Sequence, residues 1–178
     1  MFQKRSFLTA LIITPSLFLA TPPLPLPDWI SFVGGIFDVT KEKHRTIEID
    51  LEYKFHIKAM SGPFEFLEFL PLVGIMANAE GGGYVYGGIN FDFLFWDHLV
   101  IAPGFAAGGY WAGSGKNLGF PLEFRSGIEL GWQFDDGRRI GTHFYHLSNA
   151  SLGKKNPGEE SLVFYYDLPI RKKFPFYN

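Results

Sequence analysis

A histidine, a serine and a glutamate stand close together in the segment GTHFYHLSNASLGKKNPGEESLVFYYDL, which occupies residues 141–168. His146 and Ser148 are separated by one residue, and Glu160 follows after a polar stretch. A serine hydroxyl, an imidazole base and a carboxylate that orients the base together form a triad for nucleophilic attack on esters. In this order Ser148 is the predicted nucleophile, His146 the base that takes its proton, and Glu160 the carboxylate that holds the imidazole.

The flanking segments predict that these three side chains share one face of a hairpin. Between residues 138 and 149 apolar and polar residues alternate with a period of two, which is typical of a strand. His146 and Ser148 fall on the apolar face, about 7 Å apart along the strand. A second alternating segment begins at Glu160, again on the apolar face. If the hairpin pairs Ser148 opposite Glu160, His146 lies diagonally across from Glu160, within reach of a long side chain.

The loop between the two strands is the predicted source of donors for an oxyanion. Such a site needs N–H groups aimed at the negative oxygen that develops when a serine attacks a carbonyl carbon. The polar or flexible residues of the loop that are candidates to supply them, or to orient a substrate, are Asn149, Ser151, Gly153 and Asn156.

Eight segments with strand-like patterns predict an all-β fold. Glycine-rich and polar turns separate most of them. The segment that contains Pro71 also fits a kinked helix by its pattern alone. The predicted strands are 30–39, 45–58, 64–77, 83–95, 98–111, 120–134, 138–149 and 160–171.

Two architectures have strands with one apolar and one polar face. A water-soluble barrel or sandwich turns the apolar face inward, whereas a membrane barrel turns it outward to lipid. Aromatic residues make up 18% of the chain and there are 21 glycines, a combination that favours the membrane barrel. The strands are also long enough to span a bilayer, which takes about 9 to 11 tilted residues. The sequence therefore predicts an eight-stranded antiparallel transmembrane β-barrel of the outer membrane.

The N-terminal residues predict export from the cytoplasm. Lys4 and Arg5 precede an apolar run, which is the layout of a secretory signal peptide. An uncleaved anchor helix is the alternative, but Pro15 interrupts the run, which is also shorter than the roughly 20 apolar residues that a span needs. The predicted divisions are a signal peptide at 1–20, an extended Pro-rich lead-in at 21–29 and the barrel at 30–178.

The polar faces of the strands would point into the narrow interior of such a barrel. They predict a packed polar core and not a pore, because so many side chains of both charges fall on them. The charged residues of this predicted core are Glu48, Asp50, Glu52, Lys54, Glu123, Arg125, Glu129, Arg139 and Asp167.

Composition excludes several kinds of site. The net charge of −2 gives no basic footprint for nucleic acid. The absence of cysteine excludes disulfides and thiol catalysis. No spacing of histidines and carboxylates predicts a metal site, and no motif predicts a cofactor.

The orientation of the barrel decides which lipid the triad would meet. If both ends of the chain lie in the periplasm, the seventh strand runs outward and Ser148 lies at its cell-surface end. The triad then faces the outer leaflet of an outer membrane, where lipopolysaccharide is the abundant lipid.

The segment HLSNASLGKKNPGEES, residues 146–161, resembles the signature of the PagL-type lipid A 3-O-deacylases. The resemblance implies an outer-membrane esterase with His146, Ser148 and Glu160 as its triad. It also implies removal of the acyl chain esterified at position 3 of lipid A, without a metal or cofactor. Leu147 and Ser151 depart from the family's pattern, which has an aromatic residue and a glycine there.

Other interpretations remain open at the level of sequence. A non-enzymatic outer-membrane barrel, structural or adhesive, would have no use for Ser148. Outer-membrane phospholipases also carry a serine and a histidine on the barrel exterior, but they are larger and depend on calcium. Lys154 and Lys155 are either a solvated loop tip or contacts for lipid A phosphates. The sequence leaves open the acyl length that is preferred and whether the chain forms a homodimer.

Overall fold

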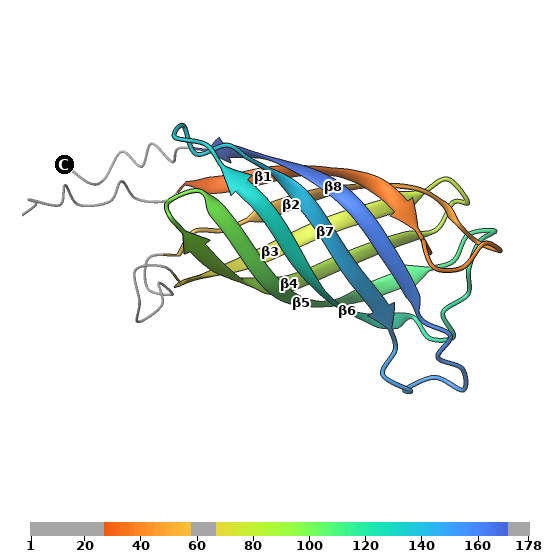
Figure 1. The fold of residues 1–178 in the computed structure, drawn as a ribbon. Helices are drawn as coiled ribbons and strands as arrows, with labels where there is room; N and C mark the ends of the chain where they lie inside the picture. Colours follow the sequence, from red (N-terminus) through yellow and green to blue (C-terminus); the bar gives the residue numbers. More distant parts are fainter. Residues whose placement is uncertain (1–26, 58–66, 171–178) are drawn as a thin grey trace, which may run out of the picture.

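Eight antiparallel strands form a closed barrel in a computed structural model that describes residues 27–57 and 67–170. Each strand pairs with its neighbours in the sequence, and β1 pairs with β8 to close the barrel (Figure 1). The predicted all-β barrel with eight strands is thereby confirmed. The strands are β1 (Asp28–Phe37), β2 (Thr46–Lys54), β3 (Leu67–Asn78), β4 (Gly83–Phe95), β5 (Leu99–Trp111), β6 (Leu122–Gln133), β7 (Arg139–Ser148) and β8 (Glu159–Ile170).

The strand ends agree with the predicted ones to within three residues, except that β2 stops at Lys54 and not at residue 58. β1 begins at Asp28, inside the expected lead-in 21–29, because Asp28 pairs with Ile170 of β8. The predicted signal peptide at 1–20 lies outside the described residues. No helix among the described residues is long and apolar enough to cross a membrane.

The segment around Pro71 forms β3 and not a kinked helix. Pro71 pairs with Ile89 of β4, and its carbonyl accepts a hydrogen bond from the backbone N–H of Phe55 at 2.8 Å. Since both backbone groups of a residue point to the same side of an antiparallel strand, the proline nitrogen also faces the β2 side. β2 has already ended at Lys54, so the missing N–H interrupts no β2–β3 ladder bond.

The outer face of the barrel is apolar from strand to strand. Large side chains that point outward are substantially exposed, as the most exposed of them on β2, β3, β6 and β8 illustrate: Ile47, Ile49, Ile75, Leu130 and Phe164. A surface of this kind is stable against lipid and not against water. The outward direction of the apolar side chains therefore supports the predicted membrane barrel over a water-soluble one.

Paired charges fill the interior. Lys54 on β2 lies 2.8 Å from Glu129 of β6 and 3.3 Å from Asp167 of β8. Arg125 lies 2.8 Å from Glu52. All nine charged residues of the predicted polar core are buried, so that prediction is confirmed. The three cations among them, Lys54, Arg125 and Arg139, each face a carboxylate, which offsets the cost of burying the charge.

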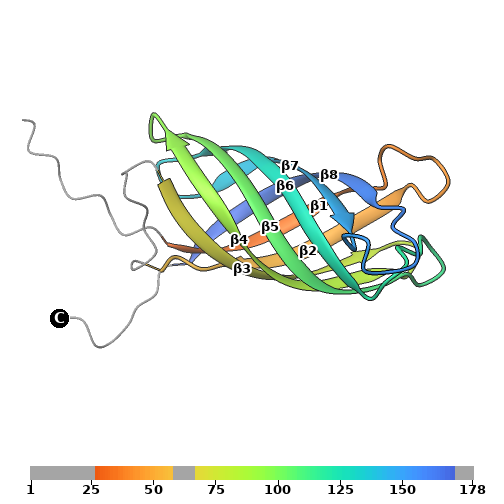
Figure 2. The ribbon, with the colours of Figure 1, turned by 90° about the horizontal axis from the view of Figure 1, so that it is seen from below.

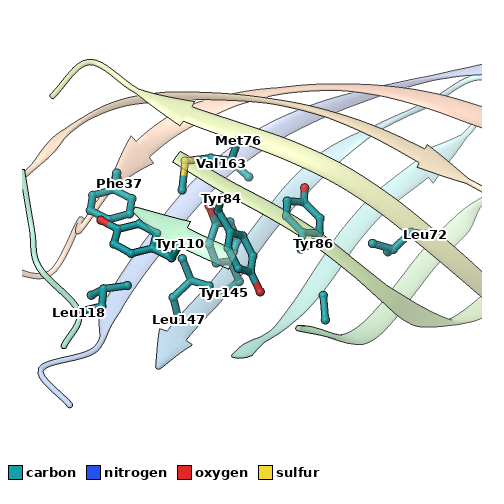
Figure 3. Close-up of a cluster of buried hydrophobic side chains, with 11 residues drawn as sticks. Phe37, Leu72, Met76, Tyr84, Tyr86, Tyr110, Leu118, Tyr145, Leu147 and Val163 are labelled. Carbon is teal, nitrogen blue, oxygen red and sulfur yellow. The ribbon is translucent and has the colours of Figure 1, made fainter. Parts of the chain in front are cut away.

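A cluster of buried apolar and aromatic side chains occupies the lumen beside these charges (Figure 3). It includes Phe37, Tyr110, Leu118 and Leu147, which come from four different parts of the chain. Leu147 lies between His146 and Ser148 in the sequence and is fully buried. Because side chains alternate along a strand, burying Leu147 inward turns both of its neighbours outward.

Four loops gather at one end of the barrel, opposite the end where β1 begins and β8 finishes (Figures 1 and 2). They are the β1–β2, β3–β4, β5–β6 and β7–β8 loops, with residues 38–45, 79–82, 112–121 and 149–158. Hydrogen bonds join these loops to one another. Ser114 donates its backbone N–H to the carbonyl of Glu80 at 2.9 Å, for example. β7 ends and β8 begins at this end of the barrel.

Candidate active site

His146 and Glu160 form a pair on the outer face, across the β7–β8 hairpin. They are directly opposite each other in the register, and His146 Nδ1 lies 3.1 Å from Glu160 Oε1. The expected pairing of Ser148 with Glu160 is wrong. Leu147 and Glu159 point inward and oppose each other, which places the next outward residues, His146 and Glu160, in direct opposition. The contact is closer than the diagonal one that the sequence suggested.

This pair fixes the role of each nitrogen of the imidazole. An ionised carboxylate can only accept hydrogen bonds, so the His146 Nδ1 that faces Glu160 carries the hydrogen. Nε2 then carries the lone pair and is the atom that can accept a proton. His146 is 41% exposed and Glu160 25%, so the imidazole is accessible from outside the barrel while the carboxylate is more covered.

Ser148 shares the outer face with His146 and is half-buried at the end of β7. It pairs with Phe124 of β6 and lies one residue beyond the last β7–β8 pair. Within the described part of the chain its hydroxyl has no hydrogen-bond partner, so it does not bond to His146 in this structure. Catalytic hydrogen bonds of this kind often tighten only when substrate is bound.

A second serine lies near the imidazole and was not among the predicted site residues. Ser126 of β6 is directly opposite His146 in the register and points outward. It lies further from the loop end of the barrel than Ser148, with the apolar Phe124 and Ile128 as its neighbours on the same face. These neighbours offer no donors to an oxyanion, whereas Ser148 adjoins the β7–β8 loop.

Asn149 has a structural task that differs from the expected one. Its backbone N–H donates to Asn156 Oδ1 at 3.0 Å, and its side-chain amide donates to the carbonyls of Leu118 and Lys155, each at 2.8 Å. The side chain is fully buried. Because all its N–H groups are engaged, Asn149 does not offer a donor to a substrate; it ties the β7–β8 loop to the β5–β6 loop.

The side-chain NH₂ group of Asn156, unlike that of Asn149, donates no hydrogen bond to the described residues. Its side-chain oxygen faces the N–H of Asn149, which turns the NH₂ group away from that bond, and the residue is exposed. Ala150 and Ser151 have left-handed φ angles of 50° and 64°, in a turn closed by the bond from Leu152 N–H to the Asn149 carbonyl at 2.9 Å. Ser151 therefore adopts a conformation that glycine takes more readily.

Leu147 stands where the PagL-type pattern has an aromatic residue, and this difference has no direct bearing on the site. Its side chain points into the barrel and packs in the apolar cluster.

Gly153 is half-buried, and Lys154 and Lys155 are exposed at the tip of the β7–β8 loop. In residues 27–57 and 67–170 no group of three histidine or carboxylate side chains is arranged to hold a metal ion.

Residues of the β1–β2 loop also reach the site, and none of them was predicted from the sequence. Thr40 donates its hydroxyl to Glu160 Oε2 at 2.5 Å, and Lys41 donates to the carbonyl of Pro157 at 3.1 Å. No local pattern marks Thr40, which is remote from Glu160 in the sequence. The available signal was the predicted closure of the barrel, since closure sets the end of β1 beside the start of β8.

Gly158 was also missed. It has a left-handed φ of 56°, and a Cβ atom added to it would lie 2.6 Å from Cε1 of His146. The imidazole therefore occupies space that any other residue at this position would fill.

Comparisons with known proteins found a related sequence, a family and a structure with a similar fold. One protein with a similar sequence is the lipid A deacylase PagL of Pseudomonas aeruginosa, which is 40% identical over 55 residues. That stretch covers 31% of this chain and 32% of the relative, so the sequence match spans about a third of its length.

A solved structure described as the outer membrane enzyme PagL has the same fold. It superposes with a TM-score of 0.66 and 22% sequence identity, over 80% of this chain and 99% of the other. The family model for lipid A 3-O-deacylase (PagL) matches residues 41–169, which is well over half of the chain and includes His146, Ser148 and Glu160. The chain belongs to the PagL family of lipid A 3-O-deacylases.

Proposed function

We propose that this protein is an outer-membrane esterase that removes the 3-hydroxyacyl chain esterified at position 3 of lipid A, with Ser148, His146 and Glu160 as its catalytic triad. The observation that carries the proposal is the His146–Glu160 pair, 3.1 Å apart on the apolar outer face of the barrel and next to Ser148. A histidine and a carboxylate reduce stability when they face lipid, so their presence together on this face is best explained by a function.

The reaction takes place in two steps. In the first, His146 Nε2 accepts the proton of Ser148 as the serine oxygen attacks the ester carbonyl carbon. The bond to the sugar oxygen then breaks, and the imidazolium gives its proton to that oxygen, which leaves as the free hydroxyl. In the second step His146 activates a water molecule, which attacks the acyl-serine and releases the fatty acid. Glu160 stabilises the imidazolium in both steps.

Asn156 is the proposed donor to the oxyanion. The tetrahedral intermediate places negative charge on the former carbonyl oxygen, and a fixed N–H donor stabilises that charge. Asn156 is exposed in the loop that follows Ser148, and its orientation is set by the bond to the backbone N–H of Asn149. Ser151, in the same loop, is a weaker candidate because its left-handed turn is strained for a residue with a side chain.

The surroundings of the triad suit the ester of a membrane lipid. Phe144 and Leu162 lie outward on β7 and β8, next to His146 and Glu160 in the direction of the bilayer centre, and both are exposed. Acyl chains can lie against them while the ester reaches Ser148. With a signal peptide at 1–20 and periplasmic chain ends, the loop end of the barrel faces the cell surface and the outer leaflet. Lys154 and Lys155 are then available to the phosphates of lipid A.

The test is mass spectrometry of lipid A from Gram-negative cells that express the full chain, compared with cells that express Ser148→Ala. We expect loss of one 3-hydroxyacyl group with the native chain and intact lipid A with the variant. Both proteins should be present in the membrane at equal amounts and in the folded form. Unchanged lipid A with folded native protein would contradict the proposal and favour a non-enzymatic barrel.

Ser126→Ala is the matched control, because it removes a second outward serine next to the same imidazole. The proposal requires this variant to deacylate lipid A. If Ser126→Ala were inactive and Ser148→Ala active, the fold and the base would remain but the nucleophile would be Ser126.

A further inference from the structure

Four successive residues of the β1–β2 loop each donate one hydrogen bond to the segment that opens β8. Asp38 N–H donates to Glu159 Oε2 at 3.2 Å and Val39 N–H to the Glu160 carbonyl at 2.7 Å. The other two bonds come from side chains: Thr40 Oγ1 to Glu160 Oε2, and Lys41 Nζ to the carbonyl of Pro157. All four donors lie on residues 38–41, and all four acceptors lie on residues 157–160.

Two of these bonds hold Glu160 itself. Its carboxylate oxygens have separate partners, His146 at Oε1 and Thr40 at Oε2, and its backbone carbonyl is held by Val39. A carboxylate bonded through one oxygen can rotate about its last side-chain bond. Hydrogen bonds to both oxygens restrict that rotation and keep Oε1 directed at the imidazole.

The loop that carries Thr40 is anchored to the barrel. The carboxylate of Asp38 accepts a hydrogen bond from Lys116 of the β5–β6 loop at 2.6 Å, and both residues are buried. Asp38 has a left-handed φ of 54°, and its carbonyl accepts a bond from the N–H of Lys41 at 3.1 Å. The chain therefore turns at a fixed point, and Thr40 is presented to Glu160 by a loop that is held on both sides.

We infer that Thr40 is a positioning residue of the active site, which acts through Glu160 to orient His146. The inference rests on the proposed triad. Thr40 donates to the carboxylate, and among the described residues no hydrogen bond joins it to His146 or Ser148, so its loss should slow the chemical step without weakening the binding of lipid A. This distinguishes it from a loop residue that only shapes the substrate site.

The experiment measures kcat and KM for lipid A hydrolysis by the purified full chain in detergent. Thr40→Val keeps the shape of the side chain and removes the hydroxyl, and Thr40→Ser restores the hydroxyl. We expect kcat to fall about tenfold in Thr40→Val, as for loss of one charge-assisted hydrogen bond, with KM unchanged. Thr40→Ser should recover most of the rate, whereas a role in packing alone would not be rescued by a smaller side chain. Thr142→Val, on the outer face of β7, is the control for loss of a threonine hydroxyl.

A double substitution tests the route of the effect. In a Glu160→Gln background Thr40→Val should cause little further loss, because the group through which Thr40 acts has been altered. An equal loss of kcat in both backgrounds would overturn the inference, and so would a Thr40→Val enzyme with native kcat.

A fluorophosphonate probe separates this inference from the proposed substrate. The probe reacts with an activated serine whatever the natural ester is, so the rate at which it labels Ser148 reports on the triad alone. Slower labelling in Thr40→Val, with recovery in Thr40→Ser, supports the inference even if native protein leaves lipid A intact. Equal labelling rates would overturn it even if lipid A is deacylated. A native chain whose Ser148 is not labelled would overturn both proposals.

Discussion

The imidazole of His146 is constrained by a glycine as well as by a carboxylate. Glu160 sets the direction of one ring edge through Nδ1, and Gly158 leaves the space in which the ring lies. If His146 is the proposed catalytic base, both constraints matter, because a displacement of about 1 Å can lower the rate of an enzymatic reaction about 100-fold.

Gly158→Ala is expected to lower lipid A deacylation by roughly 10- to 100-fold, a range set by such displacements. The added Cβ would lie 2.6 Å from Cε1 of His146, so the ring must move away from its present position. The left-handed φ adds about 1 kcal/mol of destabilisation, which is too small to unfold the barrel. Initial rates of deacylation and urea unfolding of the same preparation measure the two effects.

Gly109→Ala is the matched control for that substitution. A Cβ on Gly109 would meet no atom within 4 Å, so this variant should keep native activity. If Gly158→Ala were as active as Gly109→Ala, the proposed constraint on the His146 ring would be wrong.

Each strand has one face toward the barrel interior and one face toward the outside. Along β2 the residues Ile47, Ile49 and Leu51 point outward, and the charged residues between them point into the barrel. The same alternation on β7 presents His146 on the outside while its neighbour Leu147 packs inside. A strand can therefore present a polar residue such as His146 on the outer face without disturbing the packed interior.

The depth at which an outward position lies in the bilayer should determine how well it tolerates a charged side chain. Leu51→Arg, near the middle of β2, is expected to lower the free energy of unfolding in lipid vesicles by about 2–4 kcal/mol. Ile47→Arg, on the same face at the loop end of the strand, should lower it by only about 0–1 kcal/mol, because the charge can reach the interface. Urea unfolding followed by tryptophan fluorescence gives both values, and equal losses would mean that this face does not lie against a bilayer.

The whole barrel depends on charges that come from distant strands. Lys54 of β2 bonds to Glu129 of β6 and to Asp167 of β8, and all three are buried. The cation thus joins three strands across the lumen. Removing the cation of such a group leaves two buried carboxylates without the charge that lies closest to them.

Lys54→Met should lower the free energy of unfolding by about 3–5 kcal/mol, since a buried charge loses its partner. Neutralising both carboxylates as well, in Lys54→Met with Glu129→Gln and Asp167→Asn, should recover much of the loss. Urea unfolding of the purified protein measures this. A single substitution without effect would mean that the interior ion pairs are not needed for stability.

An exposed ion pair, at the end of the barrel opposite the four loops, provides a contrast with these buried ion pairs. Arg138 lies 2.6 Å from Asp136 in the β6–β7 turn, and its hydrogen bond lowers the pKa of that carboxyl. Since both side chains are about half exposed, solvent screens the interaction, and Arg138→Met should leave the stability nearly unchanged.

Much of this protein was determined by local sequence. The alternation of apolar and polar residues predicted most of the strands, although the Pro71 segment also fitted a helix, and it predicted the inward direction of residues such as Glu48 and Arg125. It also put His146, Ser148 and Glu160 on one outer face. These predictions succeed because the period of a strand is a property of the backbone, so the face of each residue follows from its position alone.

Register and loop contacts were decided by the tertiary structure. Whether His146 or Ser148 opposes Glu160 depends on a pairing that the alternation leaves free by two residues, since such a shift keeps every side chain on its face. The donors of Asn149 are engaged because the β5–β6 loop packs beside it. Thr40 reaches Glu160 only because closure of the barrel joins β1 to β8. A strand pattern contains no information about contacts between loops that meet only when the barrel closes.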